Sequence, residues 1–104
     1  MYTLDELSDR LFGRSLRLKV AGWVLTRDDP VFYQTQAALG VGYPPSGVVQ
    51  ELDRLVGLGM VVRHDPTPGD RRQYYTRVES PFWPIIQAAL DALKDQEPAR
   101  VSGR

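Results

Sequence analysis

The chain has 104 residues, of which 42% are hydrophobic and 25% charged, and this length and composition are those of a single globular domain. Its 13 basic and 13 acidic residues cancel, which argues against a protein that binds polyanions by total charge alone. Cysteine is absent, which excludes disulfides and thiolate metal sites, and no apolar run approaches the roughly 20 residues of a membrane span. The acidic N-terminus also lacks the apolar core of a signal peptide. We therefore expect a cytoplasmic protein with no membrane segment, metal site or cofactor.

The first part of the chain predicts a pair of helices. Thr3 and Glu6 have the spacing of a capping box, so a helix is expected from Leu4 to Phe12, followed by a terminating glycine. A second helix is expected from Ser15 to Thr26, because its apolar residues form a broad stripe. The segment 10–27 carries no acid, so the neutral total hides a basic region. Its cations Arg14, Arg17 and Lys19 are expected on a solvated helix face.

Further helices are predicted in the middle of the chain. The pair Asp28-Asp29 can cap a helix from Val31 to Leu39 that stops at Gly40, with Pro30 near its first turn. The next helix is expected to start at Pro44-Pro45, because prolines lack backbone donors and suit a first turn. Its apolar residues recur at helical spacing and are expected to face the core; they are Val48, Leu52 and Leu55.

Gly57 and Gly59 are expected to end that helix and to lead into a β-hairpin. Its strands are predicted at 60–64 and 73–78, joined by a turn rich in proline and glycine. Tyr74 and Tyr75 alternate faces, so one of them should be buried and the other exposed. A last helix is predicted from Pro81 to about Gln96, and residues 97–104 are expected to form a flexible tail. We therefore predict one α+β, mostly helical domain over residues 1–96.

Segments across most of the chain match the pattern of a known fold. They are Leu11-Phe-Gly-Arg-Ser-Leu-Arg-Leu-Lys-Val20, Ser46-Gly-Val-Val-Gln-Glu-Leu-Asp-Arg-Leu-Val-Gly-Leu-Gly-Met-Val61, Gly69-Asp-Arg-Arg-Gln-Tyr-Tyr75 and Ser80-Pro-Phe-Trp-Pro-Ile85. In this order they resemble the second helix, the recognition helix, the returning wing strand and the C-terminal helix of winged helix-turn-helix regulators of the ArsR and MarR type. The resemblance implies a homodimeric DNA-binding regulator of transcription, commonly a repressor. The cysteines that bind metal in arsenic-sensing proteins of this type are absent.

The resemblance also implies which residues would contact double-stranded DNA. A recognition helix enters the major groove by its N-terminal end, where Ser46 and Gln50 can bond base edges and Gly47 allows close approach. Glu51 and Asp53 are expected to point away from the duplex or to accept from cytosine. Cations of the wing would hold the backbone or the minor groove. The full set of candidate DNA contacts is Tyr43, Ser46, Gly47, Val49, Gln50, Arg54, Arg63, His64, Arg71 and Arg72.

The terminal helices are expected to form the dimer interface. Their apolar residues, which we predict to lie in it, are Leu4, Leu7, Leu11, Phe82, Ile85, Ile86, Ala89 and Leu93. Dimerisation would place two recognition helices at half-sites about one helical turn apart. The sequence leaves open whether a small-molecule effector also binds between the helices.

An enzyme is the least favoured class of function. With a single histidine and no cysteine, pairs of nucleophile and base are scarce. Glycines 40, 42 and 47 lack the strand and lysine of a phosphate-binding loop. A winged-helix module that binds protein, without sequence-specific DNA binding, stays open as the alternative, because the recognition helix carries Glu51 and Asp53 against Arg54.

Overall fold

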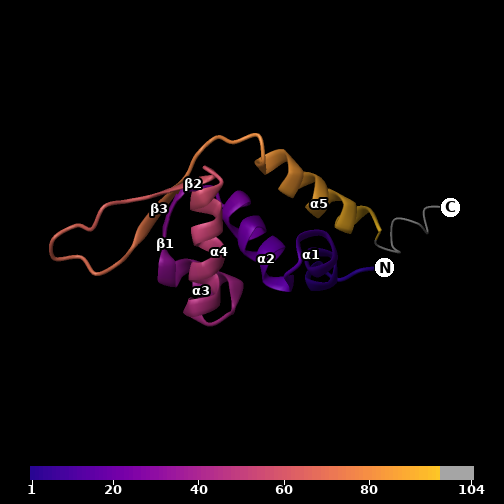
Figure 1. The fold of residues 1–104 in the computed structure, drawn as a ribbon, viewed down its shortest axis with the longest axis horizontal. Coiled ribbons are helices and arrows are strands. Elements are labelled where there is room, and N and C mark those ends of the chain that lie inside the picture. The colour runs from indigo at the N-terminus through magenta and orange to yellow at the C-terminus, as the bar shows by residue number, and fades with distance from the viewer. Residues whose placement is uncertain (97–104) are drawn as a thin grey trace.

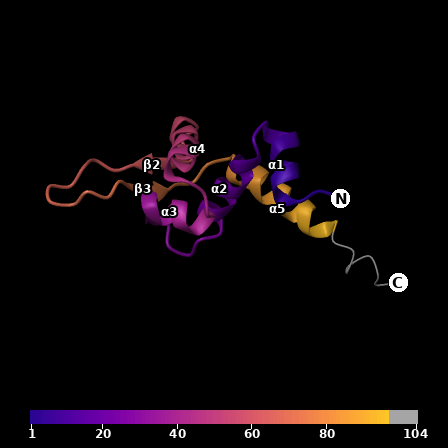
Figure 2. The ribbon, with the colours of Figure 1, turned by 90° about the horizontal axis from the view of Figure 1, so that it is seen from below.

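In a computed structural model that describes residues 1–96, the chain forms five helices and a three-stranded antiparallel sheet (Figure 1). The helices are α1 (Leu4–Phe12), α2 (Ser15–Leu25), α3 (Gln34–Val41), α4 (Pro45–Gly57) and α5 (Trp83–Asp95), and the strands are β1 (Val31–Tyr33), β2 (Val61–Arg63) and β3 (Tyr74–Arg77). Helices α1 and α5 lie at one end, α3, α4 and the sheet lie at the other, and α2 runs between them (Figure 2). The predicted α+β class is confirmed, and the predicted tail at 97–104 lies outside the described residues. None of the helices within residues 1–96 combines the length and the apolar character that crossing a bilayer requires.

Helix α1 begins and ends where the sequence predicts. Thr3 Oγ1 accepts from the Glu6 N–H at 3.1 Å, and Glu6 Oε1 accepts from the Thr3 N–H at 2.9 Å, so the capping box is confirmed. The fully buried Ser8 then joins α1 to α2. Its hydroxyl donates to the Arg14 carbonyl at 2.6 Å and accepts from the Leu18 N–H at 2.8 Å. Hydrogen bonds therefore fix the turn between these helices.

The predicted helix from Val31 to Leu39 is wrong in its first turn, because residues 31–33 form strand β1. The Asp29 carboxylate accepts from the Val31 N–H at 2.9 Å, so it holds the turn into a strand instead of capping a helix. Strand β1 pairs with β3, which lies far along the chain, and local periodicity does not report such a pairing. Helix α3 follows and continues past Gly40 to Gly42, whose φ of 82° ends it.

Strand β3 is the central strand of the sheet, between β1 and β2. In this register Tyr75 lies opposite Phe32 on one side and Arg63 on the other. Tyr75 is fully buried and stacks on Phe32, and Phe32 meets Trp23 edge-on, with ring centroids 5.5 Å apart in each pair. The prediction that one of Tyr74 and Tyr75 is buried is confirmed by Tyr75, whereas Tyr74 is half-buried and not exposed as expected. The loop between β2 and β3 projects away from the body of the molecule (Figure 1).

Helix α4 starts at the prolines as predicted, with Pro45 as its first residue. Val48 and Leu52 are fully buried and Leu55 is 7% exposed, so the predicted core face is confirmed. This face packs against α2, α3 and β2. The opposite face of α4 is therefore directed toward solvent.

Helix α5 begins at Trp83 and not at Pro81, because a turn precedes it. The Trp83 indole N–H donates to the Val78 carbonyl at 2.9 Å and ties the helix start to the end of β3. Along its length α5 packs on α2, where Gly22 leaves room for Leu90: a Cβ at Gly22 would lie 3.5 Å from that side chain.

Candidate nucleic-acid interface

The solvent face of α4 carries polar side chains in its N-terminal half. Ser46 and Gln50 are exposed and Val49 is half-buried. Because Pro44 and Pro45 have no N–H, the start of this helix offers fewer backbone donors to a phosphate than most helices offer. Recognition by this face would therefore depend on its side chains.

Two predicted contacts face the body of the protein. A Cβ at Gly47 would lie 3.2 Å from the Leu16 side chain and 3.7 Å from a guanidinium nitrogen of Arg14. Glycine at this position therefore lets α2 approach α4, and its contact with a duplex stays a prediction. Tyr43 is half-buried against the core, and Lys19 Nζ lies 5.1 Å from the centroid of its ring. Both residues contribute to packing beside α2.

Glu51 is buried, with 3% of its side chain exposed, so of the two predicted alternatives it points away from the solvent face of α4 and is not placed to accept from cytosine. Its carboxylate forms ion pairs with Arg14 at 2.9 Å and with Arg17 at 3.2 Å. The prediction of a solvated face is therefore wrong for both arginines. Arg14 Nη1 also donates to Gln50 Oε1 at 2.9 Å, so the orientation of that exposed amide is set by the same network. The network couples the start of α2 to the middle of α4.

The exposed residues farther along α4 also have charged partners. Asp53 forms an ion pair with Arg63 of β2, with 49% and 46% of the two side chains exposed. Such an exposed pair contributes little to stability and can exchange its partners, so Arg63 remains a candidate phosphate contact. Arg54 is more exposed, at 58%, and its Nε lies 3.9 Å from Glu51.

The hairpin holds the remaining predicted cations. Arg72 donates to the Asp70 carboxylate at 3.1 and 3.2 Å, and these hydrogen bonds hold the pKa of Asp70 below its usual value. Arg71 is exposed, and no ion pair among residues 1–96 involves it. His64 forms a hydrogen bond through Nε2 with the Thr76 hydroxyl. Arg71 therefore offers its full charge to a ligand, and Arg72 offers a guanidinium that is already oriented.

An aromatic pair at the base of the hairpin was missed by the sequence analysis. Tyr33 and Tyr74 face each other across β1 and β3, with ring centroids 5.6 Å apart, and the Arg72 guanidinium lies 5.3 and 5.4 Å from their centroids. The His64 ring lies 6.3 Å from Tyr74. We call Tyr33, His64, Arg72 and Tyr74 the hairpin cluster. The hairpin cluster could have been predicted only if strand β1 and its pairing register with β3 had been recognised in the sequence.

The predicted dimer residues divide by exposure. Leu11, Phe82 and Ile85 are 57%, 40% and 54% exposed, and Leu4, Leu7, Ile86 and Leu93 are half-buried. Ala89 is only 7% exposed in the chain itself, so it is not available to a partner. Helices α1 and α5 are in contact, and the Tyr2 N–H donates to Gln96 Oε1 at 2.9 Å. The exposed apolar residues therefore lie on neighbouring helices.

Comparison of the chain with protein-family models and with curated proteins finds no match. Within residues 1–96, no three histidine, aspartate or glutamate side chains gather in a way that could hold a metal ion. The function of this candidate interface is therefore inferred from the geometry and the charges of its residues.

Proposed function

We propose that the protein is a winged helix-turn-helix regulator of transcription that binds specific DNA sequences as a homodimer. The observation that carries the proposal is the juxtaposition of two elements. Helix α4 carries the exposed Ser46 and Gln50 and the half-buried Val49, and the β2–β3 hairpin, which projects from the body beside it (Figure 1), carries the exposed Arg71 and Arg72. A helix that reads base edges and an arm that binds phosphates are the two parts that such recognition requires.

The order of elements supports the same proposal. Helices α3 and α4 are consecutive and in contact, joined by a short turn, and the hairpin follows directly after α4. Strand β1 ties the hairpin to the segment just before α3 through its pairing with β3. The hairpin and α4 are therefore held in a fixed relation, as a two-part reading surface requires.

The charges assign different tasks to the two parts. Glu51 is neutralised within the protein, and Asp53 is paired with Arg63, so α4 adds little net attraction for phosphate. The hairpin residues Arg71 and Arg72 supply the exposed cations. We infer that the hairpin provides affinity and that α4 provides specificity through Ser46, Val49 and Gln50.

A protein-binding module is the second candidate, and Asp53 favours it. This carboxylate lies on the solvent face of α4, where it would repel a phosphate unless Arg63 stays paired with it. The prolines at the helix start also remove backbone donors that a phosphate could use. Both features suit a neutral protein partner better than a polyanion.

The salt dependence of DNA binding separates the two candidates. Genomic fragments that bind the protein at low ionic strength should bind less tightly as salt rises, because phosphate contacts release counterions. An Arg71→Ala, Arg72→Ala double variant should reduce the slope of log K against log salt by about 2 for each chain, and therefore by about 4 for a bound dimer. The matched control is Arg10→Ala with Lys94→Ala, which removes the same charge at the other end of the molecule and should leave the slope unchanged.

The absence of any salt-sensitive shift at low ionic strength would contradict the DNA proposal and favour the protein-binding module. Equal slopes for the two double variants would show that net charge, and not the hairpin, attracts the nucleic acid. Selection of bound sequences from a random DNA pool then tests specificity, since a nonspecific binder returns no common motif.

A further inference from the structure

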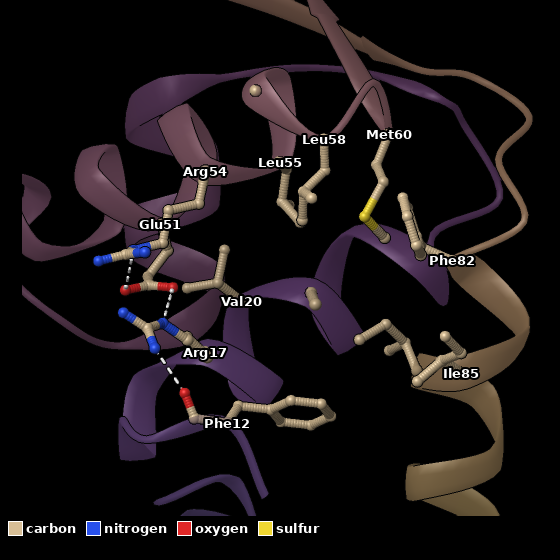
Figure 3. A pocket seen from close by; sticks show the side chains of 13 residues that line it. Phe12, Arg17, Val20, Glu51, Arg54, Leu55, Leu58, Met60, Phe82 and Ile85 are labelled. Atoms are coloured by element: carbon tan, nitrogen blue, oxygen red, sulfur yellow. Dashed lines mark hydrogen bonds and ion pairs between the residues drawn. The ribbon is translucent and has the colours of Figure 1, made fainter.

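A pocket of about 620 Å³ lies between the end of α1, the middle of α2, the second half of α4 and the start of α5 (Figure 3). Its volume is within the range of about 300–1,000 Å³ that is typical of small-molecule sites. Most of its wall is apolar, and it includes Val20, Leu55, Met60, Phe82 and Ile85. Arg54 is the one predicted DNA contact among the residues that line this pocket.

The charged side chains of the pocket are gathered at one end. In Figure 3, Arg17, Glu51 and Arg54 lie together on one side, and Leu58, Met60, Phe82 and Ile85 lie on the other. Arg14, which does not line the pocket, pairs with the same Glu51 carboxylate at 2.9 Å. Three guanidinium groups therefore surround one carboxylate, and this end of the pocket carries an excess of positive charge.

Arg54 is the guanidinium that this arrangement leaves available. Arg17 is engaged, because its Nε donates to Glu51 and its Nη1 donates to the Phe12 carbonyl. Arg54 Nε is 3.9 Å from Glu51, beyond hydrogen-bonding distance, and within residues 1–96 the Arg54 guanidinium makes no hydrogen bond. A guanidinium in this state can bind a carboxylate through two parallel hydrogen bonds.

The opposite end of the pocket exposes apolar side chains to water. Leu58 at the end of α4 is 53% exposed, and Phe82 and Ile85 at the start of α5 are 40% and 54% exposed; all three line the same hollow. Covering them would be favourable, because burial of apolar surface contributes roughly 25 cal/mol per Å². A ligand that also carried an anionic group would satisfy Arg54 at the other end.

We propose that this pocket binds an amphipathic organic anion, with its carboxylate at Arg54 and its hydrocarbon body against Leu58, Phe82 and Ile85. The combination of an exposed guanidinium that makes no hydrogen bond within residues 1–96 and an apolar hollow favours this class of ligand over a neutral hydrocarbon or a cation. Because the pocket includes the second half of α4, an occupant would contact the same helix that carries Ser46 and Gln50. The binding site itself does not depend on the proposed DNA-binding function.

The test is calorimetric titration of the protein, without DNA, with three probes below their micellar concentrations. Decanoate should bind, decanol should bind about tenfold more weakly, and decyltrimethylammonium should bind more weakly still, because a hydrogen-bonded ion pair contributes about one order of magnitude in affinity. Arg54→Gln should weaken decanoate about tenfold and leave decanol unchanged. Ile85→Ser should weaken both decanoate and decanol.

Arg71→Gln is the matched control, because it removes the same charge from an exposed arginine of the hairpin and should leave decanoate binding unchanged. Equal affinities for decanoate and decanol, or an effect of Arg71→Gln as large as that of Arg54→Gln, would overturn the proposal. The proposal would also be overturned if a second copy of the chain covered the pocket. In that case the protein would be a dimer that does not bind decanoate, and Ile85→Ser would dissociate the dimer. A lack of DNA binding would leave these outcomes unaffected.

Discussion

Glu51 has a structural role that its exposed neighbours on α4 do not share. It accepts from Arg14 and Arg17 inside the protein, whereas Asp53, two residues later, pairs with Arg63 near the surface. Breaking a buried ion pair by removing one partner is costly, because the other charge remains desolvated. An exposed pair is screened by water and contributes little.

We therefore expect Glu51→Gln to reduce the free energy of unfolding by about 2–3 kcal/mol, since the arginine side chains retain some solvent exposure. Asp53→Asn removes the same charge from the same helix and should change it by less than about 0.5 kcal/mol. Urea denaturation of the two variants measures both values. Equal effects would mean that the Glu51 network is no stronger than a surface pair.

The glycines of the helices differ in what surrounds them. A Cβ at Gly40 would lie 2.0 Å from Trp23 Nε1 and 2.6 Å from its Cε2, whereas a Cβ at Gly57 has nothing within 4 Å. The Trp23 ring is held between Phe32, at 5.5 Å, and the Arg27 guanidinium, at 4.5 Å. The ring therefore has little freedom to move away from a methyl group.

Gly40→Ala should destabilise the protein by about 1–3 kcal/mol through overpacking, despite the better helix propensity of alanine. Gly57→Ala should be neutral or stabilise it by roughly 0.5 kcal/mol. Thermal unfolding should show a lower Tm for Gly40→Ala and an unchanged or higher Tm for Gly57→Ala. A stabilised Gly40→Ala protein would mean that the Trp23 ring is mobile.

At the scale of elements, local signals predicted most of the helices and long-range contacts determined the rest. The capping box of α1 and the prolines of α4 act within a few residues, so the sequence reports them directly. Strand β1 has three residues, too few for a period, and it is a strand because β3 pairs with it. The candidate site divides in the same way between local and long-range contacts. Ser46 and Gln50 are exposed as expected from the helical spacing. The burial of Glu51 could not be predicted, because it depends on arginines more than 30 residues away in sequence.

Arg77 joins two elements that the sequence does not connect. Its Nη1 donates to the carbonyls of Val24, Leu25 and Arg27, at 2.6, 3.2 and 2.9 Å. The last carbonyls of a helix lack partners within it, and a cation there also interacts favourably with the helix dipole. Arg77 thereby fixes the end of α2 to β3.

Arg77→Met should reduce the free energy of unfolding by about 2–3 kcal/mol, because partly buried carbonyls lose a charged donor. The control is Arg71→Met, a similar change at an exposed position of the hairpin, which should cost less than about 0.5 kcal/mol. Chemical denaturation followed by tryptophan fluorescence reports both. A small effect at Arg77 would indicate that water replaces the guanidinium at these carbonyls.

At the scale of the whole molecule, the exposed apolar residues are not distributed evenly. Leu11 is on α1, at the end of the molecule opposite the hairpin (Figure 2), and Phe82 and Ile85 are at the start of α5, where they share a pocket with the end of α4. A second copy could join along α1 and α5 without covering Ser46 and Gln50 in the first half of α4. Leu39 on α3 is even more exposed, at 82%, but it belongs to the other end.

If the terminal helices form the dimer interface, light scattering should give the mass of two chains at concentrations on the order of tens of micromolar. Leu11→Glu should then shift the protein to the mass of one chain, because a charge in an apolar interface is desolvated without a partner. Leu39→Glu introduces the same charge at a more exposed leucine and should leave the dimer intact. A monomeric parent protein would exclude the dimer, and dissociation by Leu39→Glu alone would place the interface at α3, where it would compete with DNA for the same end of the molecule.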